Sequence, residues 1–108
     1  MAEEDRIASN EATFRELNEA IEEGRRTRTG RVGFLCECGV LGCNDVVELT
    51  IPEYEAVRAD GRRFFVRPGH EMEVDEILDR RREHVVVAKR GRAGRIAESR
   101  DPRAEAGA

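Results

Sequence analysis

The stretch FLCECGVLGC (residues 34–43) contains all three cysteines of this 108-residue chain, in the spacing C-x-C-x4-C. In an extended strand Cys36 and Cys38 point to the same side, and glycine at positions 39 and 42 permits the tight turns that would bring Cys43 back to them. Converging cysteine sulfurs are typical zinc ligands. The spacing therefore predicts that one loop supplies three ligands of a single metal site.

The fourth ligand is predicted to be a histidine, because a closed zinc site has four ligands and the chain has no fourth cysteine. His70 follows Pro68-Gly69, a turn that can present an imidazole without using core space. His84 opens the hydrophobic run HVVVAK and is the second choice. The predicted site is Zn²⁺ bound by Cys36, Cys38, Cys43 and His70. A [2Fe–2S] cluster, an open metal site and three buried free thiols remain alternatives.

Composition places the chain among small globular domains that need extra stabilisation. It has 39% charged and 39% hydrophobic residues, no Trp and a net charge of −4. Such a domain commonly relies on a metal or a partner. The acidic N-terminus lacks the apolar run of a signal peptide, and no stretch is apolar enough to span a bilayer. We therefore expect a cytoplasmic protein, whose reducing surroundings disfavour a disulfide and favour metal binding.

Two helices are predicted from capping and periodicity. Asn10 can cap an amphipathic helix whose apolar face carries residues 14, 17 and 21 and which ends at Gly24. A basic loop over residues 24–31 follows. Thr50 and Glu53 form a capping-box pattern, with Pro52 inside the first turn, so a second helix is expected over residues 51–59.

The remaining segments predict short strands. Residues 32–36 and 46–49 are expected to form a hairpin that carries the thiols, and residues 64–66 a further strand. Residues 73–79 and 84–89 are expected to pair as a second hairpin, although residues 73–79 could also be helical. The predicted fold is α+β: a small antiparallel sheet, an N-terminal helix, a second short helix and the Cys-rich zinc loop.

Domain boundaries follow from the same pattern. The single zinc-stabilised domain is predicted to span residues 10–98, with one helical turn near residues 93–98. We expect an acidic disordered tail over residues 1–9 and a second disordered tail over residues 99–108.

The sequence lacks the usual enzyme motifs. There is no Walker loop, GxSxG elbow, HExxH helix or dinucleotide fingerprint. Glu37 lies between two predicted ligands, but it should point away from the metal if both neighbouring cysteines point toward it. We therefore predict a structural metal in a non-enzymatic binding or regulatory module.

A cluster of basic residues late in the chain bears on partners. Candidate partner-binding residues are Arg80, Arg81, Arg82, Lys89 and Arg90. Nucleic acid is disfavoured as the partner, because the net charge is negative and the segment has few side chains for stacking or base reading. A protein partner is preferred, and a redox or metal sensor built on the cysteine loop is the other alternative.

The order of motifs also resembles a family of small uncharacterised bacterial proteins that is frequent in actinobacteria. The shared motifs are FLCECG, a third cysteine, VELT, EYEAVR, RRF, V-x-PGHE and a late VVV-x-K. The resemblance spans about residues 10–103. It implies a shared fold and supports grouping the three cysteines with His70, but it implies no substrate. This chain departs from the family in having the basic RRREH before VVV.

Overall fold

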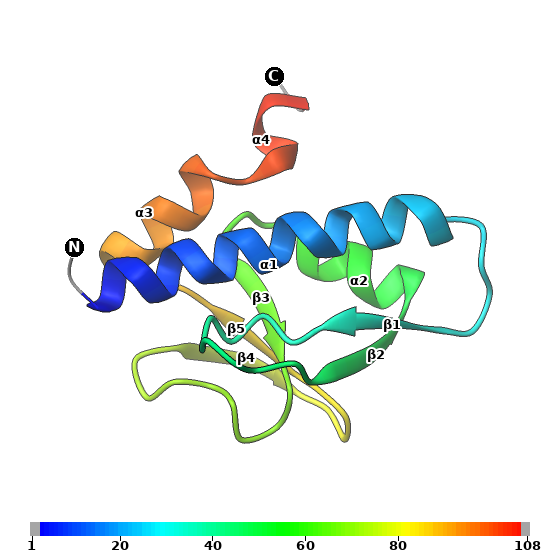
Figure 1. The fold of residues 1–108 in the computed structure, drawn as a ribbon, viewed down its shortest axis with the longest axis horizontal. Coiled ribbons are helices and arrows are strands. Elements are labelled where there is room, and N and C mark those ends of the chain that lie inside the picture. Colours follow the sequence, from blue (N-terminus) through cyan, green and yellow to red (C-terminus); the bar gives the residue numbers. More distant parts are fainter. Residues whose placement is uncertain (1–2, 107–108) are drawn as a thin grey trace.

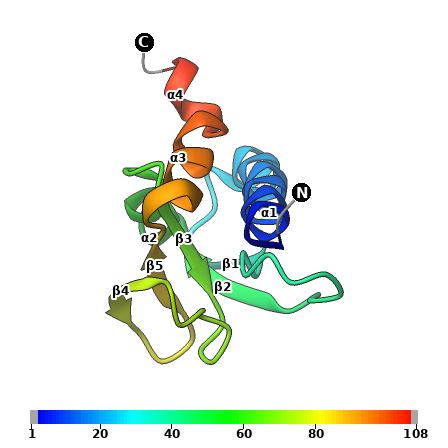
Figure 2. The ribbon, with the colours of Figure 1, turned by 90° about the vertical axis from the view of Figure 1, so that its left-hand side faces the viewer.

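The computed structural model, which describes residues 3–106, places helices above two small antiparallel sheets (Figure 1). The elements in chain order are α1 (Glu3–Arg25), β1 (Arg31–Leu35), β2 (Val46–Thr50), α2 (Ile51–Arg58), β3 (Arg63–Val66), β4 (Glu76–Arg80), β5 (Val85–Ala88), α3 (Gly91–Ser99) and α4 (Pro102–Ala106). Seen along α1, α3 lies beside that helix on the same side of the strands (Figure 2). The predicted α+β class is confirmed.

The strands form two hairpin-based sheets. β1 pairs with β2 in antiparallel register, with Phe34 opposite Val47. The second sheet has the order β3-β5-β4, and both of its pairings are antiparallel. The register shifts between Ile77 and Asp79, so the edge strand β4 contains an irregularity. The predicted pairing of the last two strands is therefore confirmed, and the helical alternative for residues 73–79 is wrong.

The start of α2 is the local structure that the sequence specifies most directly. The Thr50 side chain accepts a hydrogen bond from the Glu53 N–H, and the Glu53 carboxylate accepts one from the Thr50 N–H. This reciprocal pair satisfies two donors that a helix N-terminus otherwise leaves free. The predicted capping box is confirmed, and it ties the end of β2 to the start of α2.

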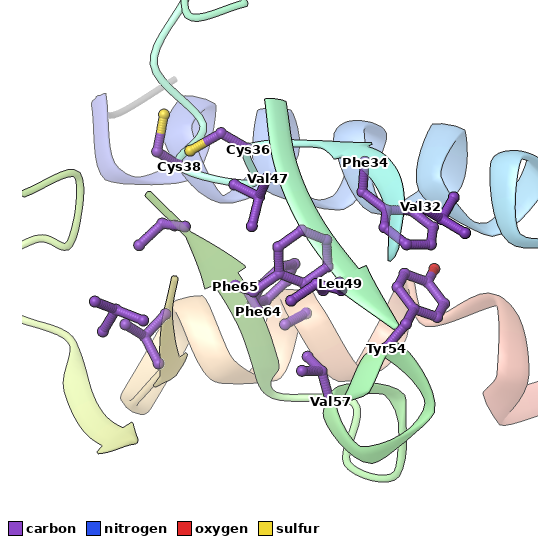
Figure 3. Packing of buried hydrophobic residues seen from close by; sticks show 14 residues of the cluster. Val32, Phe34, Cys36, Cys38, Val47, Leu49, Tyr54, Val57, Phe64 and Phe65 are labelled. Atoms are coloured by element: carbon purple, nitrogen blue, oxygen red, sulfur yellow. The ribbon is translucent and has the colours of Figure 1, made fainter. Parts of the chain in front are cut away.

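The hydrophobic core lies between the sheets and the helices. Phe34 stacks on Tyr54 with ring centroids 4.5 Å apart, and Phe65 meets both rings edge-on. Cys36 and Cys38 belong to the same cluster and lie at one end of it, away from the aromatic rings (Figure 3). Residues 36–43, called the metal loop below, are thus continuous with the core.

Helix α1 buries a polar face, which corrects the predicted amphipathic face. Leu17 is 48% exposed, and Phe14 and Ile21 are only partly buried. The fully buried positions of the helix are Ala8, Glu11, Ala12, Arg15, Asn18 and Glu22. Arg15 donates to the carbonyl oxygens of Gly61 and Ala97 at 2.7 and 2.6 Å, so burial is compensated by hydrogen bonds.

Both ends of the chain are more helical than the sequence predicts. Helix α1 begins at Glu3, seven residues before the expected start, and Asn10 donates to the Gly39 carbonyl oxygen instead of capping the helix. Arg100 donates to the Ser9 carbonyl oxygen and hydroxyl, which holds residues 3–9 against α3.

The segment expected to be a C-terminal tail contains α4, which is anchored to α1. Arg103 of this helix binds Glu19 and Glu55 at 2.6 Å each. The expected disorder over residues 3–9 and 99–106 is therefore not found, because long-range ion pairs and hydrogen bonds hold these segments. The expectation for residues 1–2 and 107–108 lies outside the described residues. Among residues 3–106, no helix is both long and apolar enough to cross a membrane.

Candidate metal centre

The loop between β1 and β2 brings the three cysteines together. The Cys36 N–H donates to the Asp45 carbonyl oxygen at 2.9 Å, which extends the β1–β2 ladder by one pair. The chain then reverses over Gly39 and Gly42, which have φ of +74° and +90°. These left-handed conformations suit glycine, because it has no Cβ to clash with the backbone. The reversal returns Cys43 to the sulfurs of Cys36 and Cys38.

His70 completes the group from the turn that follows β3 of the other sheet. The backbone N–H of His70 donates to the Arg67 carbonyl oxygen at 2.9 Å and closes this turn. The ligand atoms of Cys36, Cys38, Cys43 and His70 all lie within 4.8 Å of one another. The structure therefore brings together the four residues that the sequence predicts as ligands.

Distances around the imidazole match the requirements of a tetrahedral ion. The Nδ1 atom of His70 lies 3.6 Å from the Cys36 sulfur and 3.7 Å from the Cys43 sulfur. A tetrahedral zinc ion with usual Zn–S and Zn–N bonds separates its sulfur and nitrogen ligands by about 3.6 Å. The imidazole thus has the spacing of a zinc ligand from Cys36 and Cys43, and the whole group, within 4.8 Å, is compatible with a bound metal ion.

Asp45 contacts the ring nitrogen of His70 that does not face the sulfurs. Its carboxylate oxygen lies 3.3 Å from Nε2 of His70, on the opposite side of the ring from the sulfurs. Zinc-binding histidines usually donate their second ring N–H to a carboxylate or carbonyl, which fixes the tautomer. Sequence reasoning missed Asp45, although an acidic residue two positions after a metal-ligating cysteine could have indicated it.

The thiols lie in an environment that disfavours negative charge when no cation is present. Burial raises the pKa of the Cys36 thiol to about 12 and also raises the pKa of Cys38. The Arg67 N–H donates to the Cys36 sulfur at 3.3 Å and partly opposes this effect. The thiolates of Cys36 and Cys38 would therefore form here together with a bound cation, and binding would release their protons.

Glu37 points away from the thiols, as the alternation of a strand predicts. Its carboxylate accepts hydrogen bonds from Arg58 at 2.6 and 2.7 Å, and from the Asn18 amide at 2.8 Å. The Phe65 N–H also donates to it at 3.2 Å. Glu37 therefore joins the metal loop to α1, α2 and β3 and is no base at the metal.

Alanine substitutions at Gly39 and Gly42 test how closely α1 packs on the metal loop. A Cβ atom at Gly39 would lie 2.7 Å from the Glu11 Cγ and 2.8 Å from the Ile7 carbonyl oxygen, whereas one at Gly42 would meet nothing within 4 Å. Gly42→Ala is expected to cost about 1 to 2 kcal/mol for the positive φ alone. Gly39→Ala should cost about 1 to 3 kcal/mol more from the clash. Chemical denaturation of both variants measures the difference, and equal losses would refute the close contact.

The other predicted residues lie outside the metal group. His84 is buried beside α2 and is not a fourth ligand. Lys89 is only 5% exposed and binds Asp75 at 2.7 Å, and it also contacts the Glu11 carboxylate. The prediction of Lys89 as a partner-binding residue is therefore wrong, because two buried carboxylates occupy its ammonium group.

The predicted arginines remain at the surface. Arg80 binds Glu71 at 2.9 Å and Arg81 binds Asp79 at 2.7 Å, while Arg82 and Arg90 are exposed. Exposed ion pairs of this kind contribute little to stability. Their role in partner binding stays a prediction.

The cluster of Glu11, Asp75 and Lys89 predicts a pH dependence. Burial raises the pKa of Glu11 to about 7 from an ordinary 4.5, so the folded state holds more protons than the unfolded chain between these values. The stability that this group contributes is full below about pH 4.5 and is lost as the pH rises through about 7. From pH 5 to 8, we expect Glu11→Gln to become more stable relative to the unchanged protein, by about 2 kcal/mol.

Urea unfolding of the zinc-saturated proteins at several pH values measures this difference. The matched control is Glu23→Gln, which replaces an exposed glutamate of the same helix that has no ion pair within residues 3–106, and the stability of this variant should follow that of the unchanged protein. A constant difference between Glu11→Gln and the unchanged protein would contradict the assignment.

Comparison of the chain with protein-family models, curated proteins and solved structures finds no match. The function is therefore argued from the geometry of the site.

Proposed function

We propose that the protein is a zinc-stabilised binding module in which Cys36, Cys38, Cys43 and His70 hold one structural Zn²⁺. The observation that carries this proposal is the imidazole geometry: Nδ1 lies 3.6 and 3.7 Å from two sulfurs while Nε2 faces Asp45. Zinc would join the loop after β1 to the turn after β3 and thereby connect the two sheets. Three thiolates and one imidazole fill a tetrahedral shell, so the proposed site has no position for a substrate.

Metal content tests the proposal directly. Protein purified from metal-replete medium is expected to contain about one zinc per chain, to have no visible chromophore, and to unfold at a much lower temperature on chelation. Replacement by Co²⁺ should give the intense visible absorption of a tetrahedral thiolate site. A brown protein that contains iron would instead support the [2Fe–2S] alternative, and a metal-free, fully stable protein would refute both.

The binding role rests on what the metal loop exposes. Val40 and Leu41, at the tip of the loop, are 50% and 81% exposed. Exposed apolar side chains on a loop that a metal holds rigid are typical of a surface that binds another protein. We propose a cytoplasmic location, where the thiols stay reduced. The motif order supports membership of the actinobacterial family described above.

Nucleic-acid binding is the weaker alternative for the exposed arginines. Two of them are neutralised by neighbouring acids, so few free cations remain to contact phosphates. Any binding to DNA or RNA is expected to be independent of sequence and to vanish at physiological salt. Tight binding that persists at that salt, measured by fluorescence anisotropy, would reverse this preference.

A sensor role is favoured by one observation, the unequal exposure of the ligands. Cys36 and Cys38 are 1% and 2% exposed, whereas Cys43 is only partly buried at the end of the exposed tip. Oxidation would therefore begin at Cys43. Zinc release by micromolar peroxide supports this role, and retention of zinc under the same treatment identifies a purely structural site.

A further inference from the structure

A groove that includes none of the four candidate metal ligands in its lining has the composition of a small-molecule site. It lies between α2 and the β4–β5 hairpin and has a volume of about 320 Å³. This is at the lower end of the range of roughly 300 to 1,000 Å³ seen for ligand pockets. Its apolar lining comes from Ala56, Val57, Leu78 and Val86.

His84 lies where this groove meets a second hollow. It lines both, and the second hollow leads to Arg31 and Arg82. The residue is 5% exposed, and its ring nitrogens are not among the fully buried, unpaired polar atoms of residues 3–106, so the imidazole is accessible from the two hollows that it lines. Burial lowers the pKa of His84, so the neutral ring offers one donor and one acceptor. An imidazole that lines a hollow in this way can donate one hydrogen bond to a ligand bound there.

The charges around His84 favour an anion. The two hollows are lined by four arginines, at positions 31, 63, 81 and 82, and by three carboxylates, at positions 53, 79 and 83. The lining of the two hollows therefore has a formal net charge of +1, whereas the net charge of the whole chain is −4. Arg31 and Arg81 are paired with Glu83 and Asp79, whereas the guanidinium of Arg82 has no ion-pair partner within residues 3–106.

We propose that this pair of hollows binds a small organic anion, with its carboxylate or phosphate between His84 and Arg82 and its apolar body on the exposed side chains of Ala56 and Leu78. The head group would accept hydrogen bonds from the imidazole and from the guanidinium of Arg82, which has no ion-pair partner in the described part of the chain. The apolar body would cover side chains that the groove leaves open to water. The site is separate from the metal group, so it stands whether or not zinc binds.

The test uses the full-length, zinc-saturated protein and four probes of similar size. Phenyl phosphate and benzoate carry the proposed chemistry, while benzyl alcohol is neutral and benzylamine is a cation. In ¹H–¹⁵N correlation spectra the two anions are expected to shift resonances of residues 53–57 and 78–86, with a dissociation constant on the order of 1 mM. Equal binding of the alcohol or the amine, shifts elsewhere, or no shifts at all would overturn the proposal.

Variants at exposed positions locate the two halves of the site without disturbing the core. Arg82→Ser should weaken phenyl phosphate binding about tenfold, because a charge-assisted hydrogen bond is lost. Arg80→Ser is the matched control, since Arg80 lines neither hollow and is expected to leave binding unchanged. Ala56→Leu should block the apolar half. Binding that survives both Arg82→Ser and Ala56→Leu would place the ligand elsewhere and refute the proposal.

Discussion

His70→Ala is expected to lower both the zinc affinity and the stability of the protein strongly, and far more than substitution of the other histidine, His84. Structural zinc contributes on the order of 10 kcal/mol to the folding of small domains, so loss of one of four ligands should remove several kcal/mol. The variant also removes the metal link between the turn after β3 and residues 36–43, because His70 is the only proposed ligand outside that loop, although the hydrogen bonds between Glu37 and Phe65 remain.

The measurement is thermal unfolding of the unchanged protein and the variant, each with and without a chelator. Chelation should lower the transition temperature of the unchanged protein greatly and that of His70→Ala little. His84→Ala is the matched control: it removes a buried imidazole and some packing, but its zinc content and chelator response should be those of the unchanged protein. If His84→Ala lost zinc and His70→Ala kept it, the assignment of the fourth ligand would be wrong.

Asp45→Asn should give an intermediate result. The amide keeps the size of the carboxylate but weakens its hold on Nε2 of His70. Zinc affinity, measured by competition with a chromophoric chelator, is expected to fall about 10- to 100-fold without loss of the folded state. Unchanged affinity would show that Asp45 does not orient the ligand.

Arg58→Leu is expected to destabilise the fold by about 3 to 5 kcal/mol, because it leaves the buried carboxylate of Glu37 without its cation. The side chains of the pair are 1% and 0% exposed. The Arg58 guanidinium also lies 5.0 Å from the Tyr54 ring centroid, so a cation–π contact is lost as well. Since Glu37 stands between two proposed ligands, zinc affinity should fall together with stability.

A double variant separates the unpaired charge from simple loss of packing. Adding Glu37→Gln to Arg58→Leu removes the isolated carboxylate and should recover part of the lost stability in urea unfolding. The control Arg62→Gln removes an exposed arginine that binds Glu98 at 3.1 Å, and it should change little. A double variant that is less stable than Arg58→Leu alone would mean that Glu37 contributes mainly through Asn18 and Phe65.

The features that the sequence predicted correctly depend on short spacings. The C-x-C-x4-C loop with two glycines, the Thr50–Glu53 capping box and the pairing of β4 with β5 each involve residues close together in the chain. Local geometry restricts such segments to few conformations, so the residue types alone indicate the outcome. His70 was predicted as the fourth ligand because only two histidines were available and His70 follows a Pro-Gly turn, and the structure places it beside the three cysteines.

The polar interior was decided only by the tertiary structure. Arg15 can be buried because carbonyl oxygens 46 and 82 residues away in sequence accept its hydrogen bonds. Glu37 can be buried because Arg58, which is 21 residues away in sequence, donates hydrogen bonds to its carboxylate. Nothing local to α1 indicates that its polar face is buried more deeply than Phe14 and Ile21, or that Leu17 is exposed. Burial of a charge is favourable only when partners from distant segments arrive in the right geometry, and hydrophobic periodicity does not report where those partners lie.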